Sequence, residues 1–296
     1  MSFNPQRRMN RSGKPTRRAT SAFSLIELIG VLAIMGILAA VFTPPLVRQI
    51  AAAQGTKEEQ ILATLAAGLQ RYVRTYQQVP GAALWATNLA SVLGMNVTEV
   101  HRVDPKNSAN FRAYLIHPGF SPTTGTSPLY LQGNNGTTTV PTETRLIILS
   151  TTQPTLTLPV ASGLAASAGA FDNIWNWSFN AGTRAPPTGW PASWTGNGEH
   201  LHVVRINLGE RFFHATFSNT QFPAAIPFAK FNSLTTYAFS ATNAMDRYCL
   251  AGTVIQLFKH DTPFTSPPAN PDELDVTHVI ERDVNFVYQD NQWRLP

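Results

Sequence analysis

Residues 23–42 read FSLIELIGVLAIMGILAAVF and contain a single charged residue, Glu27. As an α-helix this stretch would be about 30 Å long, which is enough to cross the hydrocarbon layer of a membrane. Its twelve Leu, Ile, Val and Phe residues favour insertion by roughly 4–7 kcal/mol, whereas one carboxylate at mid-membrane costs about 2.5–3.5 kcal/mol. The sequence therefore predicts a membrane-spanning helix, and an acid inside such a span indicates a functional role.

The charge distribution predicts the orientation of this helix. Residues 1–22 hold six of the 22 Lys and Arg residues and no acid, which leaves 16 basic against 17 acidic residues downstream. The positive-inside rule keeps the basic leader in the cytoplasm, so the rest of the chain is expected on the far side of the membrane. With a net charge near −1, the body of the protein does not favour general nucleic-acid binding.

Three other interpretations of the apolar stretch compete with this one. A secretory signal peptide has an apolar region of only about 7–15 residues, and its cleavage site would have to lie near Ala39 and Ala40. An ordinary signal anchor fits the length but gives Glu27 no purpose. A buried helix of a soluble domain explains neither the leader nor the change in polarity.

Residues 22–28, AFSLIEL, resemble the processing site of type IV pilins and type II secretion pseudopilins. The resemblance covers residues 15–50 and implies that a prepilin peptidase cuts between Ala22 and Phe23, after which the amine of Phe23 is N-methylated. It also implies that Glu27 meets the N-terminal amine of a neighbouring subunit. The family usually has glycine before the cut, so Ala22 is a departure that bears on processing efficiency more than on identity.

The same resemblance implies a structural subunit rather than an enzyme. Its location would be the bacterial inner membrane, with a single pass and a periplasmic C-terminal domain, and later a filament at the cell surface. The implied partners are prepilin peptidase, other pilin or pseudopilin subunits, the inner-membrane assembly platform and membrane lipid, while nucleic acid is not expected. The large globular part favours a minor pilin or minor pseudopilin. A pilus-borne adhesin that binds glycans and a DNA-uptake (competence) pilin are the alternatives.

Two features predict kinks in the apolar helix. Pro44 and Pro45 lack the N–H groups that would pair with two preceding carbonyls, and Gly36 is a second weak point. In related filaments the stretch between such a glycine and proline loosens on assembly. A helix that simply leaves the membrane at Pro44 is the alternative.

Downstream of the prolines the pattern is that of an amphipathic helix. Residues 56–59, TKEE, have capping-box spacing, which indicates a second kink or a restart. An apolar stripe then recurs every three or four residues, with Lys57, Glu58, Gln60 and Arg71 mostly off it. The stripe consists of Ile61, Leu65, Leu69, Tyr72 and Tyr76. The helix is expected to end near residue 78, before the residues 79–81 that read VPG.

The remaining chain predicts an α+β fold, pilin-like, in which the long helix packs on a mostly antiparallel sheet. A short helix over 88–93 closed by Gly94, and strands at 111–116 and 145–149, are expected. Residues 201–206 and 211–217 predict a hairpin around 207–210, and 248–258 and 276–288 supply further strands. The expected domains are the leader 1–22, the membrane and filament-core helix 23–44, its amphipathic continuation 45–78, and a globular β-rich domain 79–296.

Four tryptophans within twenty residues form a candidate ligand surface. They are Trp175, Trp177, Trp190 and Trp194. Exposed rings of this kind can stack on sugars or on another subunit, but burial in a loop-rich core is the favoured interpretation. Cys249, the only cysteine, is likewise expected to be a small buried hydrophobe.

Metal binding has weak support. His200 and His202 share one face of their strand, and whether His214 joins them depends on the hairpin register. An acidic turn contains Asp272, Glu273 and Asp275. Some pseudopilins bind Ca²⁺ in a C-terminal loop, but a solvated turn is favoured here because the spacing matches no EF-hand. We expect no metal and no cofactor, with Ca²⁺ as the weaker alternative, and no motif of a nucleophile elbow, phosphate loop or zinc protease is present.

Overall fold

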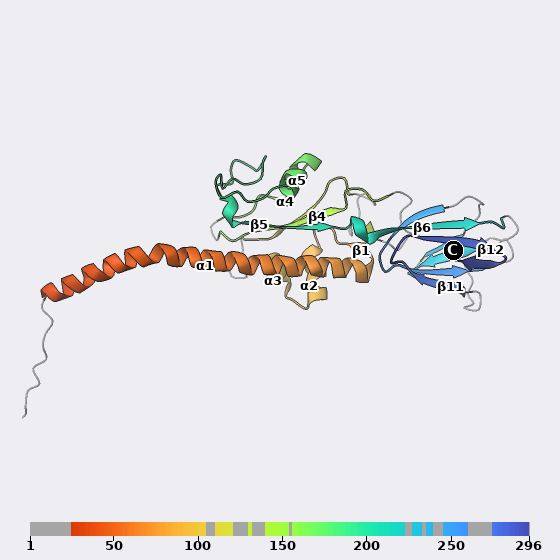
Figure 1. The fold of residues 1–296 in the computed structure, drawn as a ribbon, viewed down its shortest axis with the longest axis horizontal. Coiled ribbons are helices and arrows are strands. Elements are labelled where there is room, and N and C mark those ends of the chain that lie inside the picture. Colours follow the sequence, from red (N-terminus) through yellow and green to blue (C-terminus); the bar gives the residue numbers. More distant parts are fainter. Residues whose placement is uncertain are drawn as a thin grey trace, which may run out of the picture. The chain divides into compact units, whose positions relative to one another are not determined.

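The computed structural model describes residues 25–104, 110–120, 130–131, 140–153, 156–222, 227–232, 235–238, 245–259 and 274–295. The chain divides into two compact units, Met1–Ile50 and Ala51–Pro296. Helix α1 (Leu25–Tyr76), labelled in Figure 1, contributes to both units. The boundary therefore lies inside the segment that the sequence predicted as the amphipathic continuation of the helix.

Helix α1 is continuous across Gly36, Pro44 and Pro45, and it ends close to the expected position, since Gln77 has a φ of 53°. The predicted restart at residues 56–59 is wrong. The Thr56 hydroxyl donates to the carbonyl of Ala52 at 3.2 Å, so this side chain bonds back into the helix instead of capping a new one.

Within the second unit, α1 covers one face of a three-stranded antiparallel sheet. The sheet has the order β2 (Ala113–Ile116), β4 (Arg145–Thr151), β5 (Leu201–Asn207). Leu65 and Leu69 of the predicted stripe are fully buried, whereas Tyr76 at its end is 49% exposed.

The sheet is covered on both faces. Successive side chains of a strand point to opposite faces, so Leu146 and Ile148 pack with α1 while Ile147 packs toward α5 (Ala168–Trp175). The short helix α4 (Ala161–Leu164) lies in the same layer as α5. β4 is therefore buried on both sides.

Two further helices complete the core around α1. Helix α2 (Trp85–Leu93) ends at Gly94, which has a φ of 66°, as the sequence predicted. Helix α3 (Val97–His101) begins with a capping box formed by Asn96 and Glu99. Strand β1 (Gln78–Val79) pairs with β3 (Tyr130–Leu131).

The C-terminal half of this unit contains two four-stranded sheets. One has the order β11 (Leu274–Val279), β10 (Val254–Phe258), β7 (Phe228–Phe231), β8 (Thr235–Ala238). The other has the order β13 (Gln292–Arg294), β12 (Val284–Gln289), β6 (Phe212–Asn219), β9 (Met245–Leu250). Their inner side chains share one core, in which Phe217, Phe231 and Phe286 are buried. Cys249 is part of it, so its prediction as a buried hydrophobe is confirmed.

The predicted hairpin of 201–206 and 211–217 is wrong, because β5 pairs with β4 whereas β6 pairs with β9 and β12. A 3-10 turn, η2 (Gly209–Arg211), separates the strands. The N–H of Leu208 still donates to Thr144 beside β4, whereas the carbonyl of Arg211 accepts from Ala251 beside β9. The α+β class is confirmed. Among the strands that the structure describes, β6 and β12 form a parallel pair and the other pairs are antiparallel.

Candidate functional site

The first candidate site is the exposed apolar segment, residues 25–47 of α1. Every residue in it is exposed, and large apolar side chains such as Leu25 and Ile26 are 77% and 79% accessible. In the described part of the chain, α1 is the one helix that is long and apolar enough to cross a membrane, with a mean hydropathy of 2.6 over 18 residues and none of that window buried. A contiguous apolar surface of this extent marks an interaction with lipid or protein.

Charge is confined to the beginning of this segment. Glu27 is the first ionisable residue of the described helix and lies two residues after Leu25. The next ionisable residue along the chain is Arg48, so the interval between them carries no formal charge. Ala22 and Phe23, the predicted processing residues, lie outside the described residues.

The other end of the segment contains the two prolines and a side chain that bonds the helix backbone. Pro44 and Pro45 cannot donate to the carbonyls four residues earlier, and the Thr43 hydroxyl bonds the carbonyl of Ala39 at 2.6 Å. A Cβ added at Gly36 would meet nothing within 4 Å. The space beside Gly36 is therefore open, and the residues around both prolines are exposed.

The tryptophan rings are engaged by the protein itself. Trp194 is buried at 9% exposure and donates its Nε1–H to the carbonyl of Thr157 at 3.1 Å, while Trp190 contacts it edge to face, with ring centroids 5.5 Å apart. Trp177 donates its Nε1–H to the carbonyl of Ala185.

Trp175 is engaged in the same way. Its ring stacks on Phe171 with the centroids 6.0 Å apart, and the guanidinium of Arg145 lies 5.3 Å from its centre. Burial is thus confirmed for Trp194, and the other three rings are half-buried.

The histidines do not gather. His202 on β5 has its Nδ1 3.4 Å from the carboxylate of Glu59, whereas His214 on β6 lies in another sheet, with Nε2 2.8 Å from Asp246. Among the described residues no three His, Cys, Asp or Glu side chains are arranged to hold a metal ion.

Only one member of the predicted acidic turn can be placed. Asp275 accepts a hydrogen bond from the main chain of Trp293 at 2.6 Å. Asp272 and Glu273 lie outside the described residues, so the Ca²⁺ alternative rests on the sequence alone.

Sequence reasoning missed a buried ion pair that joins α1 to the rest of its unit. The guanidinium of Arg112 binds both carboxylate oxygens of Glu58, at 2.6 and 2.7 Å, and both side chains are almost completely buried. The Nη1 of Arg112 donates to three carbonyls at the end of α3 and just after it, those of Glu99, Val100 and Arg102.

The interpretation of Glu58 as a residue mostly off the apolar stripe is wrong, because its side chain is buried. It precedes the buried residues Leu62 and Leu65 by four and seven positions, which puts it on their face of the helix. That spacing is the signal that could have revealed it.

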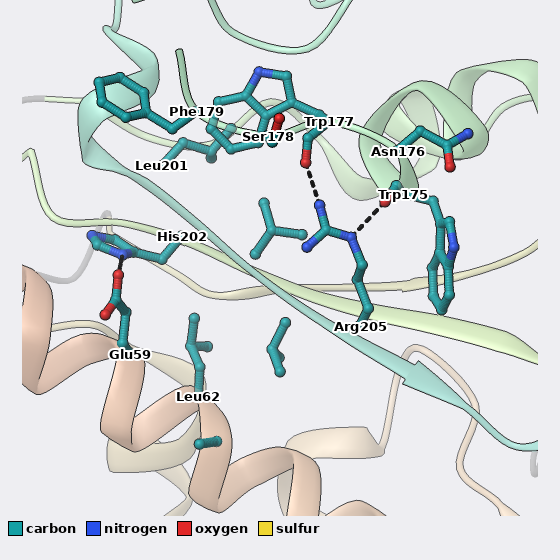
Figure 2. A pocket seen from close by; sticks show the side chains of 13 residues that line it. Glu59, Leu62, Trp175, Asn176, Trp177, Ser178, Phe179, Leu201, His202 and Arg205 are labelled. Atoms are coloured by element: carbon teal, nitrogen blue, oxygen red, sulfur yellow. Dashed lines mark hydrogen bonds and ion pairs between the residues drawn. The ribbon is translucent and has the colours of Figure 1, made fainter. Parts of the chain in front are cut away.

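A cleft of about 600 Å³ opens beside β5 (Figure 2). Its walls are Glu59, Leu62 and Ala63 of α1 and residues 175–179, and residues 201–205 form the strand between them. Arg205 donates hydrogen bonds to the carbonyls of Trp175 and Trp177. Partial burial lowers the pKa of its guanidinium, because desolvation disfavours the charged form.

The exposed apolar segment offers a surface for lipid or for another helix. The cleft offers polar side chains from α1, from β5 and from residues 175–179. No protein-family model, no curated protein and no solved structure matches this chain.

Proposed function

We propose that the chain is a structural subunit, a minor pilin or minor pseudopilin, of a type IV pilus-like or type II secretion filament. A prepilin peptidase removes residues 1–22, Phe23 becomes the N-methylated first residue, and the exposed apolar segment anchors the subunit in the bacterial inner membrane. The second unit then lies in the periplasm until assembly carries it into the filament. The function proposed is assembly and not an enzymatic reaction.

One observation carries the proposal. The apolar surface of residues 25–47 is exposed along its whole length, and its single acid, Glu27, lies near the start of the described helix. About 20 helical residues cross a hydrocarbon layer of about 30 Å. Counted from Leu25, that length ends near Pro44, so the carbonyls that the prolines leave without partners would meet the polar interface. The positions of the acid and the prolines thus suit the two edges of a membrane.

The position of Glu27 also gives assembly an energetic drive. Placing a carboxylate near the end of an apolar span is costly. In the filament, the amine of a processed Phe23 on a neighbouring subunit would lie beside it as a cation, and two charges in an apolar medium gain most by pairing. Neither partner needs to leave the membrane for this contact.

The glycan-binding adhesin and the DNA-uptake pilin would use the same anchor. An adhesin needs open aromatic faces, whereas the indoles of Trp175 and Trp194 are engaged by Phe171, Arg145 and Thr157. DNA uptake needs a basic surface, and the chain beyond the leader is near neutral. A structural subunit is therefore the function that these contacts favour.

The test is the variant Glu27→Gln, which keeps the shape of the side chain and removes its charge. In cells that produce the filament, we expect the variant to reach the membrane in normal amounts. Its amount in sheared filaments should fall roughly tenfold or more, because the amine of Phe23 on the neighbouring subunit loses the carboxylate that would pair with it. Immunoblots of the membrane and filament fractions measure both quantities.

Glu59→Gln is the matched control, since Glu59 is an exposed acid of the same helix; it should enter filaments normally. Normal incorporation of Glu27→Gln would contradict the pairing role. A loss of both variants from filaments would indicate a general effect on the helix and would also count against it.

A further inference from the structure

Strand β5 is an edge of its sheet. In the order β2-β4-β5 it pairs along its whole length with β4, with Leu201 opposite Thr151 and Asn207 opposite Arg145. No described strand pairs with its other side. An edge strand presents main-chain donors and acceptors that another extended chain can bind.

The register identifies which main-chain groups face outward. The N–H of Leu208 donates to Thr144 and that of Thr152 donates to His200, so these pairs are the hydrogen-bonded ones. Hydrogen-bonded and non-bonded pairs alternate along an antiparallel ladder. It follows that His202, Val204 and Ile206 bond to β4, whereas Val203 and Arg205 direct their N–H and C=O groups away from it.

These outward groups lie in the cleft of Figure 2, where β5 runs between α1 on one side and residues 175–179 on the other. Within the described part of the chain no hydrogen bond reaches the main chain of Val203 or Arg205 from the open side. The two walls leave a slot along the strand. An extended chain placed in this slot would lie alongside the outward main-chain groups of β5.

The charge of Arg205 indicates the chemistry of the occupant. Its guanidinium binds two carbonyls, those of Trp175 and Trp177, and no carboxylate of the described residues forms an ion pair with it. Glu59 in the other wall lies against His202, apart from Arg205 in Figure 2. An acidic side chain beside Arg205 would therefore meet a cation without a carboxylate and would avoid Glu59.

We propose that the open edge of β5 binds an extended, acidic peptide segment of another protein, which adds to the sheet as a fourth strand. The main chain of Val203 and Arg205 supplies the ladder of hydrogen bonds, and the guanidinium of Arg205 selects an Asp or Glu of the peptide. This mode gives affinity through the backbone and specificity through alternate side chains. The inference does not depend on the filament proposal.

The probe is a synthetic peptide of alternating Val and Thr with a central Asp, as long as the seven-residue strand β5. It is titrated into the full chain in detergent micelles, and amide exchange is followed by NMR. Binding should slow exchange of the Val203 and Arg205 amides roughly tenfold or more, while the amides of His202 and Val204, already bonded to β4, stay unchanged.

Variants of the peptide keep the test independent of protein folding. N-methylation of the alternate residues that face β5 should abolish binding, and N-methylation of the other set should not. Replacing the central Asp by Asn should weaken binding roughly two- to fivefold, as expected for a partly exposed ion pair. Arg205→Gln should remove this preference for Asp.

Three outcomes would overturn the proposal. One is the absence of saturable binding, and another is binding that leaves the Val203 and Arg205 amides unchanged. The third is slow exchange of both amides before any peptide is added, because a segment of this chain would then already occupy the edge.

Discussion

Removal of the Glu58 carboxylate should destabilise the second unit more than any other loss of a single charge on α1. Arg112 is 2% exposed, and in Glu58→Ala its guanidinium loses both of its carboxylate bonds. Breaking a buried ion pair from one side costs about 3–5 kcal/mol, because the remaining charge stays buried. The three carbonyls that Arg112 also binds still solvate the cation in part, so we expect a loss near 3 kcal/mol, the lower end of that range.

The assay is urea unfolding of the full chain in detergent micelles, followed by tryptophan fluorescence. A loss of about 3 kcal/mol lowers the ratio of folded to unfolded protein more than 100-fold. Glu59→Ala is the matched control, because that neighbouring side chain is 68% exposed and only approaches His202; it should cost no more than about 1 kcal/mol.

Equal effects of the two substitutions would refute the reasoning, because the argument depends on burial and not on charge alone. A loss below about 1 kcal/mol for Glu58→Ala would have the same consequence.

Two further predictions concern the same unit. A Cβ at Gly68 would lie 2.8–2.9 Å from three atoms of Leu93. Overpacking of this kind costs about 1–3 kcal/mol, whereas replacing glycine by alanine stabilises a helix by about 1 kcal/mol. Gly68→Ala should therefore lower the free energy of unfolding by up to about 2 kcal/mol. Gly36→Ala, with nothing within 4 Å, should leave that unfolding transition unchanged, and equal behaviour of the two variants would contradict the packing argument. Burial, and then the positive charges of Arg102 and Arg112, lower the pKa of His101 below its usual 6.5. The folded state therefore resists protonation of His101, so the stability that this residue contributes is complete above pH 6.5 and is lost as pH falls through the lowered pKa. His101→Gln should lose less stability than the parent chain between pH 7 and pH 5 in urea titrations, and parallel losses would show that His101 is not responsible.

Local patterns were sufficient to predict α1. Its apolar run and the recurring Leu65, Leu69 and Tyr72 are features of short-range periodicity, and the helix ends at Tyr76, close to the predicted residue 78. The C-cap at Gly94 was also predicted correctly, since a glycine after an apolar helical pattern favours the left-handed conformation. These elements depend on residues within a few turns of one another.

Local patterns could not predict which strands pair with one another or which charged side chains form ion pairs. The segments 201–206 and 211–217 have good strand character, but which strand each one joins depends on β4, β9 and β12, far along the chain. Arg112 is 54 positions from Glu58, so neither residue reveals the pair by itself. The cleft beside β5 forms where three segments that are distant in the sequence meet. The sequence of any one segment is therefore not enough to predict it.

The mass of the mature N-terminus tests most directly whether the apolar segment is the anchor of a processed filament subunit. The protein would be purified from the membranes of cells that contain a prepilin peptidase, and its N-terminal peptide measured by mass spectrometry. We predict a chain that begins with N-methylated Phe23 and remains in the membrane fraction. A chain that keeps residues 1–22, or one cut near Ala39 and Ala40 and released in soluble form, would contradict this prediction.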